Sequence, residues 1–133
     1  MEQSHYLVVN GSMTHLGDKP TFIMGLGEFI GKLYFAKFDL PENMNPNEKA
    51  IMQYRIVHNN ETSKKFFLNE RLIGNFTENT LENRDICIMD VLVIPEKSLV
   101  PGENNIHIGC THSSTDGNVD FAVDDIIIWY KTV

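Results

Sequence analysis

The sequence predicts an all-β protein, a single antiparallel β-sandwich or jelly roll over residues 1–133. Short apolar segments recur along the chain, and turn-forming Gly, Asn and Pro residues separate them. No long segment shows apolar residues at helical three-four spacing behind an N-cap. Hydrophobic residues make up 42% of the 133 positions, enough to bury one core. No repeat, linker or low-complexity tract divides the chain, so we expect one domain.

The first half of the chain holds two clear strand candidates. Residues 32–40, "KLYFAKFDL", end at Pro41, and the stretch "PENMNPNEKA" that follows is predicted to be a loop. Residues 50–60 alternate in the manner of a half-buried antiparallel strand. The apolar face of that strand carries Ala50, Met52, Tyr54 and Ile56, and the polar face carries Gln53 and Arg55.

The middle of the chain predicts a hairpin and a further strand. Phe66 to Leu68 lead into a tight turn at Asn69-Glu70, and the second strand of the hairpin starts near Leu72. The segment "ICIMDVLVIP" is apolar on both faces apart from Asp90, which predicts a central strand of the sandwich. A Pro-Gly turn at residues 101–102 then leads into another strand.

The closing segment, "DFAVDDIIIWYK", sets two adjacent acids into an apolar strand. Strict alternation places Asp125 on one face, with Val123, Ile127 and Trp129, and Asp124 on the other. An unpaired buried carboxylate costs several kcal/mol. Each aspartate is therefore expected to have a partner, such as backbone N–H donors, or to lie where the sheet meets solvent.

Charge and composition exclude several classes of function. The net charge of −7 repels a phosphate backbone, and Lys64-Lys65 is the only basic doublet, so no nucleic-acid partner is expected. No apolar run reaches the length of a membrane helix and no signal peptide precedes the domain, which predicts a cytoplasmic protein without a membrane partner. Cys87 and Cys110 lie in strand-like segments and would pair only if their strands were neighbours.

Two motifs resemble the galactose-binding-like jelly-roll domains, the superfamily that includes many carbohydrate-binding modules. The hairpin "FFLNERLIGNF" matches at Leu68, Asn69, Ile73 and Gly74, although Glu70 replaces the usual glycine. The segment "LVPGENNIHIG" matches at Leu99, Pro101, Gly102, Asn105, Ile106 and Ile108. In this motif Asn105 is expected to bond the backbone of the turn while Ile106 and Ile108 enter the core. The closing strand, "FAVDDIIIWY", resembles the last strand of the same domains.

The resemblance implies a structural calcium site and a carbohydrate ligand. An acid of the closing strand would bind the metal, which suggests a site formed by Asp124, Glu28 and Asp18. Ligands of such folds bind at the loop end and on exposed aromatic rings. The residues predicted to contact a ligand are Asn75, Thr77, Asn79, His112, Ser113, Asp116 and Trp129.

Catalysis is not expected. The densest polar cluster, "HIGCTHSSTD", offers His107, Cys110 and His112, but His107 and Cys110 point to opposite faces of an extended strand. The remaining aromatic candidates, Tyr34, Tyr54, Phe76 and Tyr130, are expected to pack in the core. The sequence therefore predicts a non-catalytic binding module. The alternative is a structural or assembly protein, a possible homo-oligomer, which would expose a contiguous apolar patch instead of aromatic rings beside polar loops.

Overall fold

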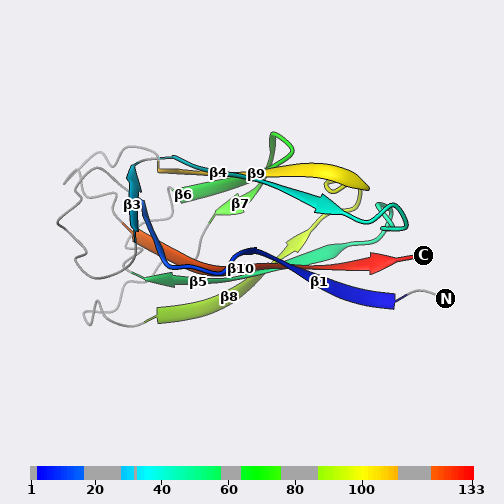
Figure 1. The fold of residues 1–133 in the computed structure, drawn as a ribbon, viewed down its shortest axis with the longest axis horizontal. Helices are drawn as coiled ribbons and strands as arrows, with labels where there is room; N and C mark the ends of the chain where they lie inside the picture. Colours follow the sequence, from blue (N-terminus) through cyan, green and yellow to red (C-terminus); the bar gives the residue numbers. More distant parts are fainter. Residues whose placement is uncertain (1–2, 17–27, 32, 58–63, 76–86, 111–120) are drawn as a thin grey trace.

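Two β-sheets packed face to face form the protein (Figure 1). The computed structural model describes residues 3–16, 28–31, 33–57, 64–75, 87–110 and 121–133. The strands are β1 (Gln3–Asn10), β2 (Thr14–Leu16), β3 (Glu28–Gly31), β4 (Leu33–Leu40), β5 (Ala50–Val57), β6 (Lys64–Leu68), β7 (Arg71–Asn75), β8 (Cys87–Ile94), β9 (Gly102–Cys110) and β10 (Phe121–Thr132). The described residues include no helix, and so none long and apolar enough to cross a membrane.

The larger sheet has six strands in the order β3-β2-β10-β5-β8, with β1 also paired to β10. The smaller sheet has four strands in the order β4-β9-β6-β7. All pairings are antiparallel except that of β2 with β3. Both chain ends lie at the same end of the sandwich (Figure 1). The predicted antiparallel β-sandwich is confirmed.

The core fills the space between the two sheets. Strand β5 buries Ala50, Met52, Tyr54 and Ile56, as its alternation predicts. These side chains meet others from both sheets in one cluster that includes Phe38, Leu40, Phe66, Leu68, Ile94, Leu99, Ile106, Ile108, Val123, Ile126 and Ile128. Burial of apolar surface of this kind supplies most of the driving force for folding.

The predicted hairpin is present as β6 and β7, joined by the two residues Asn69 and Glu70. Both have positive φ angles, 50° and 67°, the geometry of a type I′ turn. Asparagine tolerates this left-handed region, whereas glutamate does so at a cost of about 1 kcal/mol or more. The missing glycine therefore leaves strain at Glu70.

Replacing Glu70 with glycine is expected to stabilise the protein by about 0.5–1 kcal/mol, because relief of the strain exceeds the extra entropy of glycine in the unfolded chain. Urea denaturation followed by circular dichroism measures the change. Glu42→Gly is the control, since Glu42 is also exposed but has no positive φ. If Glu70→Gly loses as much stability as the control, the positive φ of Glu70 does not strain the backbone.

The turn before β9 is held by Asn104, and the prediction that Asn105 holds it is wrong. The Asn104 Nδ2 amide donates to the carbonyl oxygens of Val100 and Gly102 at 2.8 and 3.0 Å, and its Oδ1 accepts from the Val100 N–H at 2.9 Å. Alternation along β9 turns Asn104 inward, where it is 1% exposed, with Ile106 and Ile108. The Oδ1 atom of Asn105 is buried and has no hydrogen-bond partner.

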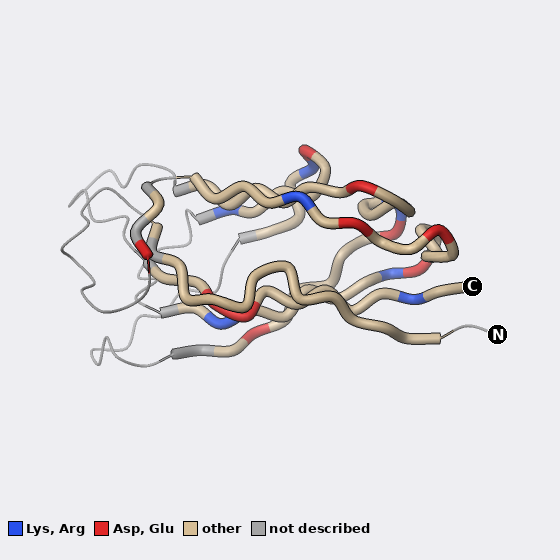
Figure 2. The backbone as a smooth tube through the Cα atoms, in the orientation of Figure 1, with Lys and Arg blue, Asp and Glu red and all other residues tan. Residues whose placement is uncertain are grey.

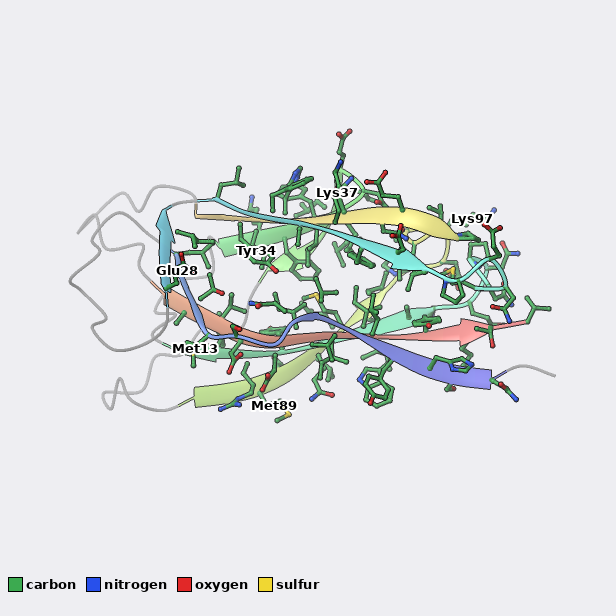
Figure 3. All side chains as sticks on the ribbon, in the orientation of Figure 1. Met13, Glu28, Tyr34, Lys37, Met89 and Lys97 are labelled. Carbon is green, nitrogen blue, oxygen red and sulfur yellow. The ribbon has the colours of Figure 1, made fainter. Side chains whose placement is uncertain are left out.

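Strand β8 is an edge strand, so the prediction of a central strand from "ICIMDVLVIP" is wrong. Within the described residues β8 pairs with β5 and with no second strand. Its outward residues Met89, Val91 and Val93 are exposed, and Figure 3 shows Met89 pointing away from the other sheet. Apolar side chains on both faces indicated burial, but one of these faces is open to solvent.

The two cysteines lie on strands of different sheets, Cys87 at the start of β8 and Cys110 at the end of β9. The condition set for their pairing, that the strands be neighbours, is therefore not met. The predicted loop after Pro41 is confirmed between β4 and β5, where Met44 forms an isolated bridge to Thr132.

Strand β10 runs through the middle of the larger sheet, and a β-bulge interrupts its alternation. Asp124 pairs with Arg55 and Ile127 with Gln53, which leaves Asp125 and Ile126 opposite a single residue of β5. Asp125 has a positive φ of 50°. Before the bulge the odd-numbered Val123 is buried in the core, whereas after it the even-numbered Ile126 and Ile128 are. The predicted sharing of one face by Val123, Ile127 and Trp129 is therefore wrong.

Candidate functional site

The outer face of the six-stranded sheet carries a contiguous group of exposed apolar side chains. We call it the apolar face and define it by Tyr6, Val8, Ile51, Met89, Val91, Val93 and Trp129. The strand register explains the group, because directly paired residues point to the same side of a sheet. One row across four strands is Tyr6, Trp129, Ile51 and Val93, and the next is Val8, Ile127, Gln53 and Val91.

Trp129 lies near the middle of the first row. Its ring centroid is 5.1 Å from that of Tyr6, at an interplanar angle of 42°. The indole Nε1–H donates to the Oε1 of Gln53 at 3.3 Å, and the Nε2 of Gln53 lies 3.4 Å from the Met89 sulfur. Trp129 remains 40% exposed and Tyr6 60% exposed. The result is a pair of oriented aromatic rings open to solvent.

A shallow hollow of about 230 Å³ lies beside the indole ring. Its wall consists of Ser4, Lys49, Ile51, Trp129, Tyr130 and Lys131. Tyr130 is adjacent to Trp129 in sequence; it contributes to this wall and is also packed, partly buried, against the core. The surface of the hollow is mostly apolar, and Ser4, Lys49 and Lys131 are the residues of its wall that carry hydrogen-bond donors.

The two aspartates lie toward the other end of β10, and Arg55 contacts both. The Arg55 Nη1 is 2.8 Å from the Oδ2 of Asp125 and 3.7 Å from the Oδ2 of Asp124. Asp124 also accepts the backbone N–H of Asp125 through its Oδ1 at 2.8 Å. The bulge allows both acids to reach the same guanidinium. A backbone N–H donor to an aspartate was predicted, and Asp124 has one. The arginine partner was not predicted.

The predicted calcium ligands are only partly described. Asp124 is already beside a cation, Glu28 is exposed at the start of β3, and Asp18 lies outside the described residues. In the described part of the chain, no three His, Cys, Asp or Glu side chains gather as a metal site would require. Calcium binding by Asp124, Glu28 and Asp18 stays a prediction.

Most of the predicted loop-end ligand residues are not described. Thr77, Asn79, His112, Ser113, Asp116 and the aromatic candidate Phe76 all lie outside the described residues. Asn75 is the last residue of β7, in the smaller sheet, whereas Trp129 lies in the larger one. The structure therefore does not bring Asn75 and Trp129 onto one sheet.

The other predicted core aromatics are inside. Tyr54 is fully buried, and Tyr34 is partly buried against the core and points between the sheets (Figure 3). Burial raises the pKa of the Tyr34 hydroxyl, because the charged phenolate is disfavoured away from water. Neither ring presents a surface to a ligand on the apolar face.

Several residues of the candidate site were not predicted from sequence, namely Ser4, Tyr6, Lys49, Gln53 and Lys131. The signal for Tyr6 was available, since the segment "QSHYLVVN" is uncharged and rich in β-forming residues. The signal for Lys49 was not, because only the folded structure places a residue between β4 and β5 beside Trp129.

Solved structures with the same fold include two carbohydrate-binding modules. A family 35 carbohydrate-binding module from an environmental isolate is 20% identical in sequence to this chain. The match covers 96% of this chain and 90% of the module, with a TM-score of 0.50. The CBM36-1 domain of a multidomain xylanase from the hindgut metagenome of Trinervitermes trinervoides is 14% identical in sequence. This match covers 94% of the present chain and 96% of the domain, with a TM-score of 0.54. No protein-family model and no curated protein matches the sequence. The predicted fold resemblance to such modules is confirmed.

Proposed function

We propose that this chain is a non-catalytic carbohydrate-binding module, and that it holds a polysaccharide against Trp129 and Tyr6. The observation that carries the proposal is the exposed pair of aromatic rings beside a hollow lined by Ser4, Lys49 and Lys131. The fold shared with two carbohydrate-binding modules supports the same class of ligand.

The chemistry of the site suits a sugar ring. The C–H groups of a pyranose are apolar and pack on an aromatic face, while its hydroxyls require hydrogen-bond donors and acceptors at the rim. Gln53 fixes the Trp129 ring through the indole N–H, so little side-chain entropy is lost when a sugar stacks on it. A row of side chains across four strands also suits an extended chain of several sugar units.

The loop-end residues and the calcium site remain parts of the proposal. Asn75, Thr77, Asn79, His112, Ser113 and Asp116 would supply a second set of polar contacts. Calcium held by Asp124, Glu28 and Asp18 would act as a structural ion. In that case Asp124 would have to exchange the Arg55 guanidinium for the metal.

Native affinity electrophoresis tests the function. The net charge of −7 draws the chain toward the anode at neutral pH. Gels cast with xylan, galactan, mannan or mixed-linkage β-glucan are expected to retard it in at least one case, relative to a gel without polysaccharide. Equal mobility in all gels would overturn carbohydrate binding.

A parallel set of gels addresses the metal. Addition of EDTA is expected to abolish the retardation and added calcium to restore it. Retardation that persists in EDTA would remove calcium from the proposal and leave carbohydrate binding standing.

A further inference from the structure

We propose that the apolar face is also a self-association surface, through which two copies of this chain pack face to face. The second copy would cover Trp129, so that a dimer and a bound polysaccharide exclude one another. The self-association rests on the surface alone, and only the competition rests on the proposed function.

The size of the apolar face supports a protein partner. Its seven side chains are between 40% and 62% exposed. Together they form a contiguous exposed apolar patch, and patches of this kind mark interaction surfaces in folded proteins. A stable interface buries about 800 Å² on each partner, so the apolar face and its polar rim suffice for one. Five of the seven residues are aliphatic or methionine, which suits a packed protein interface better than a sugar.

The β8 edge of the larger sheet is a poor alternative for association. On the edge strand β8, the carboxylate of Asp90 accepts the backbone N–H of Val91 at 2.8 Å. This contact occupies a donor that a second strand would need, and it places a negative charge where the strand would lie. Acidic side chains at sheet edges prevent such pairing in natural β-proteins. Packing through the face is therefore favoured over pairing through the β8 edge.

The charges at the two ends of the face identify a second copy as the partner. Toward one end of β10 lie Asp124 and Asp125, which both contact the Arg55 guanidinium. At the other end lie Lys49 and Lys131, beside Trp129. The red and blue segments of β10 lie in this order along the strand in Figure 2.

This arrangement is self-complementary. A two-fold axis in the plane of the interface, perpendicular to the strands, reverses the strand direction of the second copy. The lysine end of each copy then meets the acidic end of the other. Sheets pack face to face at about 10 Å, a distance that long side chains span. An interface of this kind repeats every contact twice.

Sedimentation equilibrium tests the self-association over a range of protein concentrations. The wild-type chain is expected to approach twice its monomer mass of 15.2 kDa at high concentration. Val91→Lys is expected to raise the dimer dissociation constant at least tenfold, since it places a charge on the apolar face, between Met89 and Val93 of β8. Leu72→Lys is the matched control, because Leu72 is 51% exposed on the other sheet and Val91 is 54% exposed.

Two outcomes would overturn the self-association. One is a wild-type chain that stays monomeric at several hundred micromolar. The other is a dimer that Val91→Lys and Leu72→Lys weaken equally. Val93→Lys is a second variant on the face, and circular dichroism confirms that each variant is folded. Lys49→Glu is expected to weaken the dimer as well, because it removes a contact with the acidic end.

The competition is tested separately with a hexasaccharide of the polysaccharide that retards the chain in the gels, xylohexaose in the case of xylan. Saturating amounts are expected to shift the wild-type chain toward monomer and to leave Val91→Lys unchanged. A dimer that persists with bound sugar would overturn the competition but not the self-association. A monomer that binds sugar would overturn the self-association and leave the proposed function intact.

Discussion

Replacing Asn104 with alanine is expected to lower the free energy of unfolding by about 3 kcal/mol. The side chain makes bonds to Val100 and Gly102, and its Oδ1 also accepts the Nδ2–H of Asn69 at 2.8 Å. Removal leaves several partly buried donors and acceptors unpaired, and each such group costs about 1–3 kcal/mol unless water replaces the lost partner.

The same network links the turn before β9 to the β6–β7 hairpin. Asn69 donates to the carbonyl oxygen of Ser98 at 2.9 Å and accepts the backbone N–H of Asn105 at 2.9 Å. Loss of Asn104 therefore loosens both turns of the smaller sheet. Urea denaturation monitored by circular dichroism gives the midpoint and the slope, and an unchanged slope is expected.

Asn105→Ala is the matched control for this experiment. The Asn105 side-chain oxygen already lacks a partner, so its removal is expected to cost less than about 1 kcal/mol. Equal losses in Asn104→Ala and Asn105→Ala would show that the bonds to Asn104 do not hold the turn.

Replacing Trp129 with alanine is expected to weaken polysaccharide binding by tenfold or more. The variant removes the central ring of the proposed site and the bond that orients Gln53. Stacking on an aromatic ring contributes on the order of 1 kcal/mol beyond the buried area. Loss of the buried indole surface adds to this. Affinity electrophoresis over a series of polysaccharide concentrations gives the dissociation constants.

Two variants make the Trp129 result specific. Trp129→Phe keeps an aromatic face and is expected to retain part of the affinity. Phe35→Ala removes an exposed ring on the other sheet, where Phe35 packs against His107 at 4.8 Å, and is expected to leave binding unchanged. Binding lost in Phe35→Ala but retained in Trp129→Ala would move the site to the smaller sheet.

The sequence predicted the fold through local signals. Alternation in β5 identified its buried face, and Asn69 identified a turn that needs positive φ angles. These signals are local because a strand's side-chain period and a turn's backbone geometry depend on a few neighbouring residues.

The errors arose where distant residues decide the outcome. The bulge at Asp125 depends on pairing with β5, and no single segment encodes it. The position of β8 at the sheet edge likewise depends on the order of the strands. Asn104 and Asn105 are identical in type, so only the inward direction of β9 at Asn104 distinguishes their roles.

Trp129 is the residue of the candidate site that the sequence predicted as a ligand contact. The other members of the site come from β1, from the connection before β5, from β5 itself and from the end of β10, and the sheet register brings them together. Arg55 was predicted on the polar face of its strand, but its contact with both aspartates required the bulge.

Tryptophan fluorescence tests the central claim most directly, because Trp129 is the single tryptophan of the chain. The chain is titrated at low micromolar concentration with a hexasaccharide of the polysaccharide that retards it, xylohexaose in the case of xylan. A saturable shift of the emission to shorter wavelength is predicted, with the affinity found by electrophoresis. Saturable binding measured by calorimetry, with the tryptophan emission unchanged, would contradict the assignment of the apolar face as the binding site.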